Sequence, residues 1–118
     1  MKWKVIFHEA FEQEFETLSQ AVQDAIYART DILEIFGPKL GRPKVDTLSG
    51  SKHANMKELR LDADGGVWRV AFAFDPKRQA VLLVAGDKTG GSQKRFYKQL
   101  IKKADKRFDD WLDRQKGG

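Results

Sequence analysis

The amino-acid sequence predicts a single α+β domain that spans residues 1–118. Three patterns lead to this prediction: alternating apolar residues at the N-terminus, helical periodicity in the stretches that follow it and that close the chain, and a three-stranded meander at 56–88. A chain of this length buries a modest core without disulfide bonds. We expect an N-terminal strand and a helical hairpin packed on an antiparallel sheet, with a basic C-terminal helix.

The first third of the chain predicts a strand and two helices. Alternation of apolar residues between Trp3 and Phe7 is typical of a strand with one buried face, and the apolar spacing becomes helical from His8 onward. Ser19 suits the N-cap of a second helix, which divides the region into a helical hairpin. Gly37-Pro38 ends that helix, because glycine favours the C-terminal cap and proline cannot continue a helix.

Residues 37–55 form the longest stretch without a regular pattern, and long loops in small domains are usually functional or disordered. The stretch leads into the meander and is rich in basic residues. They are Lys39, Arg42, Lys44, Lys52 and His53. His53 is a candidate acid or base because its ordinary pKa lies near neutral pH, although loop histidines more often have no catalytic role.

The stretch from 56 to 88 predicts three strands joined by two tight turns. Asp64-Gly65 is a strong signal for a two-residue hairpin, and the proline after Asp75 suits the second position of a type I turn. A turn centred on Asp64-Gly65 places Arg60 opposite Arg69 on neighbouring strands. Alternation then gives one apolar face, formed by Leu59, Leu61, Trp68, Val70, Phe72 and Phe74.

The opposite face of this hairpin carries the two opposed arginines. Like charges in that position destabilise a sheet by roughly 0.2–1 kcal/mol, so Arg60 and Arg69 indicate an anion-binding site and are not expected to stabilise the fold. The small side chains of Ala71 and Ala73 beside Arg69 predict an open concavity. In the alternative interpretation the face is ordinary and solvated, with Arg60 paired to Glu58 or Asp62 and Arg69 paired to a helix carboxylate.

The third strand, predicted from Gln79 to Asp87, is apolar on both sides, which is typical of a strand covered on both faces. A two-residue turn at Pro76-Lys77 sets its register and therefore its faces. The core face then holds Val81, Leu83 and Ala85, and the arginine face holds Leu82, Val84, Gly86 and Lys88. A slip of one residue would exchange the two faces.

The chain closes with a long basic helix that Ser92 is positioned to cap. Its apolar residues recur with helical spacing and predict one buried stripe. The stripe consists of Phe96, Leu100, Ile101, Ala104, Phe108, Trp111 and Leu112. Tyr97 lies in the first turn, near the end of the third strand, where it is either a surface tyrosine or a catalytic phenol.

Charge is distributed unevenly along the chain. Residues 1–36 contain three Lys/Arg and seven Asp/Glu, a net charge of −4, whereas residues 37–118 contain nineteen against ten, a net charge of +9. A basic body suggests a polyanionic partner such as nucleic acid. The chain has no cysteine and its two histidines lack metal-ligand spacing, so we expect no metal site and a reducing, cytoplasmic environment. No apolar run approaches the length of a membrane span, so we expect no membrane partner.

The order of the predicted elements carries a resemblance to a known family. A strand, two helices, three strands and a helix are combined with the segments Lys57-Glu-Leu-Arg60, Trp68-Arg-Val70 and Val84-Ala-Gly-Asp-Lys88. In this order and spacing, the chain resembles the RelE/ParE toxin superfamily over nearly its whole length, and within it the HigB branch, whose relatives include phage-derived Gp49-like proteins. The resemblance implies a RelE-like fold.

The resemblance also implies a function and a partner. It implies the toxin of a type II toxin–antitoxin system, an endoribonuclease that cuts translated mRNA in the A site of the ribosome without a metal or other cofactor. The antitoxin, in this branch often a helix-turn-helix protein of the HigA type, could cover the basic face or grip the acidic helices. Two alternatives stay open: a ParE-like inhibitor of DNA gyrase with the same fold, and a non-catalytic nucleic-acid-binding module.

Active sites in this superfamily combine arginines, lysines and sometimes a histidine or tyrosine on the concave face of the sheet. The candidates for catalysis are the matching residues Arg60, Arg69, Lys88, Lys57 and Tyr97, together with His53 from the basic loop. The residues expected to bind RNA are Lys52, Lys94, Arg95 and Lys98. Many relatives place a histidine or tyrosine near the C-terminus, but none follows Trp111 here, so the general acid and base stay open.

Overall fold

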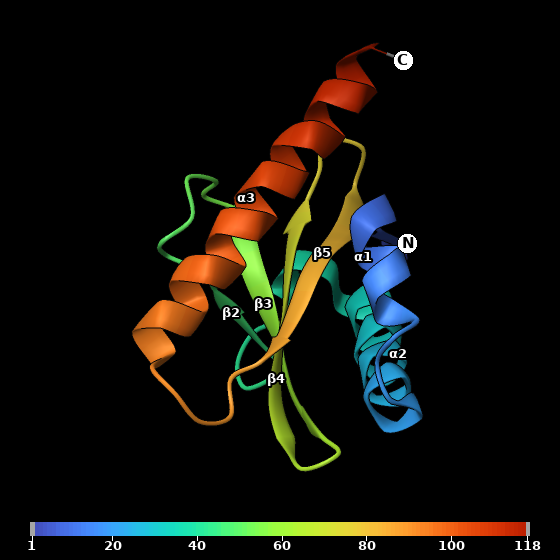
Figure 1. Ribbon diagram of the computed structural model, residues 1–118. Coiled ribbons are helices and arrows are strands. Elements are labelled where there is room, and N and C mark those ends of the chain that lie inside the picture. The colour runs from blue at the N-terminus through green and yellow to red at the C-terminus, as the bar shows by residue number, and fades with distance from the viewer. Residues whose placement is uncertain (1, 118) are drawn as a thin grey trace.

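The computed structural model describes residues 2–117 and confirms the α+β class. Its elements, most of which are labelled in Figure 1, are β1 (Lys4–Phe7), α1 (Glu9–Phe15), α2 (Gln20–Phe36), the 3-10 helix η1 (Gly37–Lys39), β2 (Val45–Thr47), β3 (Met56–Ala63), β4 (Gly66–Phe74), β5 (Gln79–Asp87) and α3 (Gln93–Gly117). Only η1 and β2 fall in the stretch that carries no regular sequence pattern. None of the helices in the described part of the chain is long and apolar enough to cross a membrane.

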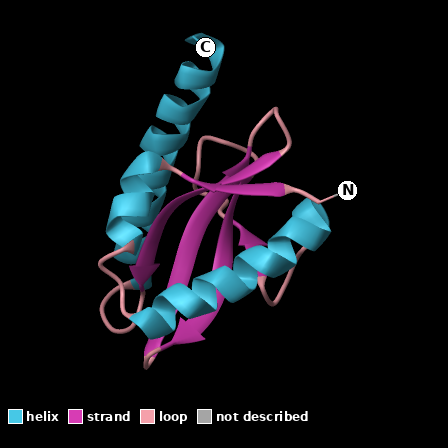
Figure 2. Ribbon diagram, turned by 90° about the vertical axis from the view of Figure 1, so that its right-hand side faces the viewer, coloured by secondary structure: helices cyan, strands magenta, loops and turns pink. Residues whose placement is uncertain are grey.

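The strands form one sheet in the order β1-β5-β4-β3-β2. The predicted antiparallel pairing of β3, β4 and β5 is confirmed, and β2 is also antiparallel to β3. The N-terminal strand β1 pairs with β5 in parallel, so the sheet as a whole is mixed. Figure 2 shows α2 crossing one face of the sheet and α3 lying on the opposite side. This arrangement is the RelE-like fold expected from the resemblance.

Each face of the sheet has its own core. The face under α1 and α2 is filled mainly by aromatic and branched residues, and the six predicted residues of the β3–β4 hairpin all lie in it or pack against it. The face under α3 is filled by the predicted stripe of that helix. Ala71 and Ala73 are fully buried there against Leu100, Ala104 and Phe108. The open concavity predicted beside Arg69 is therefore filled by α3 along these two alanines.

The two caps of α2 agree with the sequence signals, and α1 has a cap that was not predicted from the sequence. The side chains of His8 and Ser19 accept hydrogen bonds from the backbone at the starts of α1 and α2. α2 is capped at its C-terminal end by Gly37. The backbone angles of Gly37, φ 53° and ψ −136°, are a combination that residues other than glycine rarely adopt. A Cβ atom at Gly37 would also lie 2.3 Å from the ring of Trp3, so this position needs glycine for two independent reasons.

We expect Gly37→Ala to lower the free energy of unfolding by about 2–4 kcal/mol, because backbone strain and overpacking each cost roughly 1–3 kcal/mol. Gly41→Ala is the matched control, since no atom lies within 4 Å of a Cβ built there. Urea denaturation of both variants measures the difference. Equal stability of the two variants would contradict the steric role assigned to Trp3.

The β3–β4 hairpin has the predicted turn and register. Asp64 and Gly65 both have positive φ, as a type I′ turn requires. Arg60 lies opposite Arg69, and Leu59 lies opposite Val70. The two-residue turn at Asp64-Gly65 fixes the register of the hairpin, and this register places the two arginines side by side.

The next turn differs from the prediction by one residue. Arg78 adopts a positive φ of 63°, and the backbone of Asp75 donates a hydrogen bond to Gln79, so the turn contains three residues between paired ends. The register of β5 is therefore shifted by one residue from the predicted one. Leu82 lies on the face under α1 and α2, and Val81 and Leu83 lie under α3, whereas the prediction placed them the other way round.

A β-bulge in β5 then restores the predicted register. Phe72 pairs with Leu82, but its neighbour Ala71 pairs with Val84, so one residue of β5 is left over. After the bulge, Arg69 lies opposite Gly86 on the face predicted for both. A Cβ atom at Gly86 would lie 2.8 Å from Phe96, so glycine permits the first turns of α3 to approach the arginine face.

Asp75 joins the β4–β5 turn to the end of α3. Its carboxylate accepts hydrogen bonds from Trp111 Nε1 at 2.9 Å, Gln115 Nε2 at 3.1 Å, Gln79 Nε2 at 2.7 Å and the backbone of Lys77 and Gln79. Burial alone would raise the pKa of Asp75, but the hydrogen bonds from Trp111 and Gln79 outweigh it and hold that pKa below its ordinary value.

We expect Asp75→Asn to lower the free energy of unfolding by roughly 1–3 kcal/mol at neutral pH, because an amide accepts fewer of these hydrogen bonds and loses the charge. A carboxylate whose pKa is lowered in the folded state contributes stability above its unfolded pKa. That contribution is lost as the pH falls through the pKa of Asp75 in the folded protein. The difference in free energy of unfolding between wild type and Asp75→Asn should therefore become smaller below pH 3.8. Urea denaturation at several pH values tests this, and a gap independent of pH would contradict it.

Candidate active site

The two opposed arginines differ in exposure. The side chain of Arg60 is 28% exposed, whereas that of Arg69 is only 6% exposed. Glu58, two residues before Arg60 on β3, points to the same face and is equally buried. A carboxylate therefore lies beside the two guanidinium groups at the place where the sequence suggests an unoccupied anion site.

Glu58 contacts both arginines and Tyr97 of α3. Its Oε2 accepts a hydrogen bond from Arg60 Nη1 at 3.1 Å, and its Oε1 accepts one from the Tyr97 hydroxyl at 2.9 Å. Oε1 also lies 3.6 Å from Arg69 Nε, and Arg69 Nη1 donates to the carbonyl oxygen of Trp68 at 2.9 Å. No hydrogen-bond partner is present for the buried Arg69 Nε among the described residues.

This contact corrects the expectation that the arginines only repel each other. The alternative interpretation is confirmed for Arg60, which pairs with Glu58. It is wrong for Arg69, whose ion pair is also with Glu58 and not with a helix carboxylate. The negative charge of Glu58 attracts both arginines and so offsets the repulsion between them. The three side chains together keep a net charge of +1.

Tyr97 is the contact between this group and α3. Burial raises the pKa of Tyr97, the hydrogen bond to the Glu58 carboxylate raises it further, and Arg69 opposes the shift. The phenol is therefore a proton donor at neutral pH. Lys88, which follows β5, has its Nζ 6.0 Å from the centre of the Tyr97 ring, on the side predicted for it.

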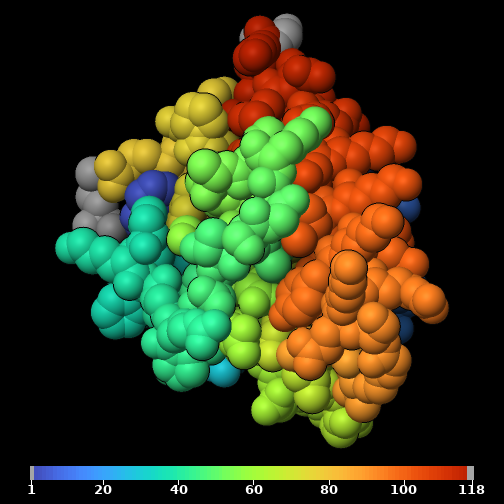
Figure 3. Space-filling model, turned by 90° about the vertical axis from the view of Figure 1, so that its left-hand side faces the viewer, coloured from blue at the N-terminus to red at the C-terminus, as the bar shows by residue number. Residues whose placement is uncertain are grey.

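A hollow of about 440 Å³ opens over Glu58, Arg60 and Tyr97. Figure 3 shows the face on which residues of the 42–50 segment lie beside the first turns of α3. The other residues that line the hollow are Arg42, Asp46, Thr47, Leu48, Ser49, Gly50, Lys94 and Ile101. A second hollow of about 280 Å³ lies on the other side of Arg60 and is lined by Arg29, Pro43, Lys44, Leu61, Asp62 and Arg69. Arg60 thus faces both hollows.

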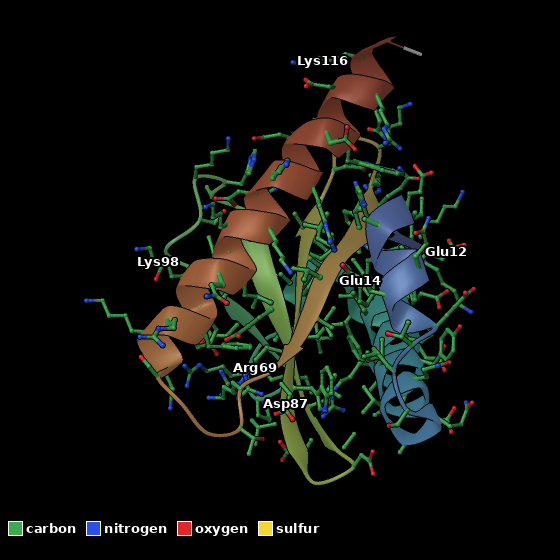
Figure 4. The ribbon with its side chains drawn as sticks, in the orientation of Figure 1. Glu12, Glu14, Arg69, Asp87, Lys98 and Lys116 are labelled. Carbon is green, nitrogen blue, oxygen red and sulfur yellow. The ribbon has the colours of Figure 1, made fainter. Side chains whose placement is uncertain are left out.

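Three of the predicted RNA-binding residues lie beside this site, at the start of α3. Lys94 lines the larger hollow, and Arg95 and Lys98 are exposed on the same part of the helix. Figure 4 shows Lys98 pointing away from the body of the molecule. None of the three forms an ion pair with a residue between 2 and 117, so their charges are available to a ligand.

Three other candidates are not brought to the site. His53 Nε2 lies 2.8 Å from Asp109 of α3, and Lys52 pairs with the same carboxylate, so the loop is docked against the later turns of the helix. His53, a candidate acid or base from the basic loop, therefore lies against Asp109 and not beside the arginines. Lys57 alternates with Glu58 on β3, faces the other side of the sheet and has its Nζ 3.5 Å from Thr47 Oγ1.

Glu58 is the functional candidate that sequence reasoning did not include. The available signal was its spacing: it lies two residues before Arg60 and so shares a strand face with it. Its contact with Tyr97 depends on how α3 crosses the sheet, which no local pattern specifies. Together these residues form a compact group with a buried carboxylate, a phenol, a guanidinium that faces the hollow and several free cations.

Comparisons with known proteins identify the family of this chain. The family model described as "Phage derived protein Gp49-like (DUF891)" matches residues 13–109. Two proteins of Mycobacterium tuberculosis (strain ATCC 25618 / H37Rv) are similar to the chain. "Putative toxin HigB3" is 44% identical over 114 residues, which are 97% of this chain and 97% of that protein. "Putative toxin HigB2" is 45% identical over 96 residues, which are 80% of this chain and 47% of that protein.

The fold, together with these comparisons, assigns the protein to the class of RelE/ParE-type toxins. Within that class, the chain belongs to the phage-derived Gp49-like family of HigB-type toxins.

Proposed function

We propose that this protein is the toxin of a type II toxin–antitoxin system and cleaves mRNA on the ribosome. The observation that best supports the proposal is the position of Arg60, whose guanidinium is held by Glu58 in a hollow that Lys94 and Tyr97 also line. Arginine binds phosphate oxygens in a bidentate manner and keeps its charge in proteins. The hollow of about 440 Å³ falls within the roughly 300–1,000 Å³ typical of small-ligand sites.

In the proposed reaction, RNA supplies its own nucleophile. The 2′-oxygen attacks the adjacent phosphorus, the bond from phosphorus to the 5′-oxygen breaks, and a 2′,3′-cyclic phosphate and a free 5′-hydroxyl are formed. One group must accept the proton of the 2′-hydroxyl, and another must donate a proton to the 5′-oxygen. Cations must stabilise the charge that develops on the phosphate, which is usually the largest contribution to catalysis.

We assign these roles to the residues around the hollow. Arg60 binds the phosphate and stabilises the transition state. Tyr97 accepts the proton of the 2′-hydroxyl as it passes its own proton to Glu58, to which it is already hydrogen bonded. Lys94 protonates the leaving 5′-oxygen. Arg69 is a positioning residue, because it is buried against Glu58 and its side chain is too enclosed to reach RNA.

Expression of the chain without a partner tests the proposal. We expect growth to stop, protein synthesis to fall, and 5′-end mapping to reveal new cuts within translated frames. The Arg60→Ala variant, expressed to the same level, should leave mRNA intact. Intact mRNA together with DNA breaks that depend on gyrase would overturn the proposal in favour of a ParE-like inhibitor.

We also propose that the partner of this toxin is a small antitoxin with a helix-turn-helix DNA-binding domain of the HigA type. The proposal is supported by membership of the HigB-type family and by the names of the two similar proteins, which are toxins. Co-expression with the protein encoded next to this chain's gene should restore growth. Failure of that protein to restore growth or to co-purify would reject it as the antitoxin.

A further inference from the structure

A third hollow, on the face of the molecule opposite to α3, has no role in the proposed reaction. It measures about 430 Å³, lies between β1, α1 and α2, and is lined by Phe7, Glu12, Phe15, Glu16, Gln23 and Tyr27. The three aromatic rings form its floor, with Tyr27 at 6.2 Å from Phe7 and 5.1 Å from Phe15 between ring centres. Tyr27 is nevertheless 51% exposed, so much of its side chain remains accessible at the surface. We call this hollow the hairpin groove.

The carboxylates of α1 divide into two pairs. Glu14 binds Arg107 through two hydrogen bonds of 2.8 and 2.7 Å, and Glu9 binds Arg114 at 2.8 Å. Figure 4 shows Glu14 on the side of α1 toward β5, and Glu12 on the outer side. Glu12 and Glu16 are exposed at the hairpin groove and form no ion pair with any residue from 2 to 117.

The free pair of carboxylates is unfavourable for the isolated toxin. Glu12 and Glu16 are four residues apart, a spacing at which like charges destabilise a helix. Glu16 also occupies the C-cap of α1, where the helix dipole favours a positive charge, and the last turn of α1 contains no basic residue. A cation bound at the hairpin groove would offset both the repulsion between the two carboxylates and the unfavourable charge at the C-cap. The aromatic floor of the groove is suited to an apolar group.

We infer that the hairpin groove is the docking site of the antitoxin, an inference that rests on the proposed function. The occupant is a segment of the antitoxin that places an apolar side chain between Phe15 and Tyr27. Lysine or arginine residues beside it pair with Glu12 and Glu16. Charge complementarity supports this choice, because residues 1–36 carry −4 and the rest of the chain carries +9.

This location also determines how the antitoxin neutralises the toxin. The hairpin groove and the Arg60 hollow lie on opposite faces of the sheet, so an antitoxin in the groove leaves Arg60, Lys94 and Tyr97 uncovered. Neutralisation then occurs because the bound antitoxin is too large to enter the ribosome with the toxin. The cationic hollow stays empty in the complex.

Calorimetry tests the docking site, with the protein encoded next to this chain's gene as the probe and the Arg60→Ala toxin as a non-toxic background. We expect the double variant Glu12→Lys/Glu16→Lys to raise Kd at least about 100-fold, because like charges at an interface are strongly unfavourable. Tyr27→Ala should raise Kd by about 30-fold, as loss of an aromatic anchor does. The matched control is Asp24→Lys/Asp113→Lys, which reverses two exposed helical carboxylates outside the hairpin groove and should change Kd less than about 3-fold.

The opposite ranking would overturn the inference. If Lys94→Glu/Lys98→Glu weakened binding and the Glu12/Glu16 variant did not, the antitoxin would cover the active site instead. The absence of any binding to the wild-type surface would overturn it as well. Circular dichroism melting curves confirm that each variant is folded before its Kd is compared.

A second readout separates this inference from the proposed function. In the otherwise wild-type chain, Glu12→Lys/Glu16→Lys should still cut mRNA and stop growth, but co-expression of the antitoxin should no longer rescue the cells. If the wild-type chain cut no mRNA, the proposed function would fail, yet the ranking of Kd values would still decide where the antitoxin docks.

Discussion

Replacing Arg69 with alanine is expected to lower the free energy of unfolding by about 3–5 kcal/mol, because removing one partner of a buried ion pair leaves the other charge uncompensated. Glu58 is the charge that would be left, with only the partly exposed Arg60 and the Tyr97 hydroxyl to balance it. Urea denaturation of the purified variant measures the effect. The result would be opposite to the mild effect expected from cross-strand repulsion alone.

A double-mutant cycle identifies the cause of this loss. Glu58→Gln alone should also destabilise the fold, because it leaves the Arg69 guanidinium buried without its counter-charge. In the double variant Glu58→Gln/Arg69→Ala neither of these two charges is left buried without its partner. The loss of unfolding free energy in the double variant should therefore be much smaller than the sum of the two single losses. Additive losses would show that Arg69 stabilises the fold through packing and not through Glu58.

Replacing Arg60 with alanine is expected to reduce mRNA cleavage by about 10²–10³-fold, by analogy with removal of a single donor that stabilises a transition state. Its effect on stability should stay within about 1 kcal/mol, because a partly exposed ion pair contributes little and Glu58 keeps its contact with Arg69. Single-turnover cleavage on purified ribosomes measures the rate, and thermal melting measures the stability.

The Arg60→Lys variant separates charge from geometry. Lysine keeps the positive charge but lacks the planar fork, so most of the loss in cleavage should persist. Lys77→Ala, which removes an exposed charge on the β4–β5 turn, serves as the control and should cleave normally. If Arg60→Ala cleaved as fast as wild type, the hollow around Arg60 would not be the active site.

Local sequence patterns predicted the turns and helix ends correctly where the backbone conformation suits only a few residue types. Asp64-Gly65 determined the β3–β4 register, and Ser19 and Gly37 marked the ends of α2 correctly. The β4–β5 turn was predicted one residue too short, because it depends on Arg78 adopting a positive φ that nothing in its side chain favours. The bulge opposite Ala71 and Phe72 then cancelled that error. β2 has only three residues and forms by pairing with β3, so it left no periodic pattern.

The candidate site was predictable only in part. The hairpin register placed Arg60 beside Arg69, and the end of β5 placed Lys88 beside Tyr97 on the predicted side, because both follow from strand alternation. Glu58 and His53 were misjudged for a different reason. Their partners, Tyr97 and Asp109, lie on α3, and the angle at which a helix crosses a sheet is decided by packing across the whole core.

The parallel pairing of β1 with β5 also sets the order in which the protein can be completed during its synthesis. The ribosome delivers β1, α1 and α2 first, but β1 pairs with β5 alone in the sheet and must wait until Gln79 and the residues after it have emerged. Contacts between residues so far apart in the chain form late, because the entropy of closing the intervening loop opposes them. Phe7 of β1 lines the hairpin groove, so the groove takes its final form only after β1 has joined β5. An antitoxin that docks in the groove, as we propose, therefore binds a nearly complete toxin and not a growing chain.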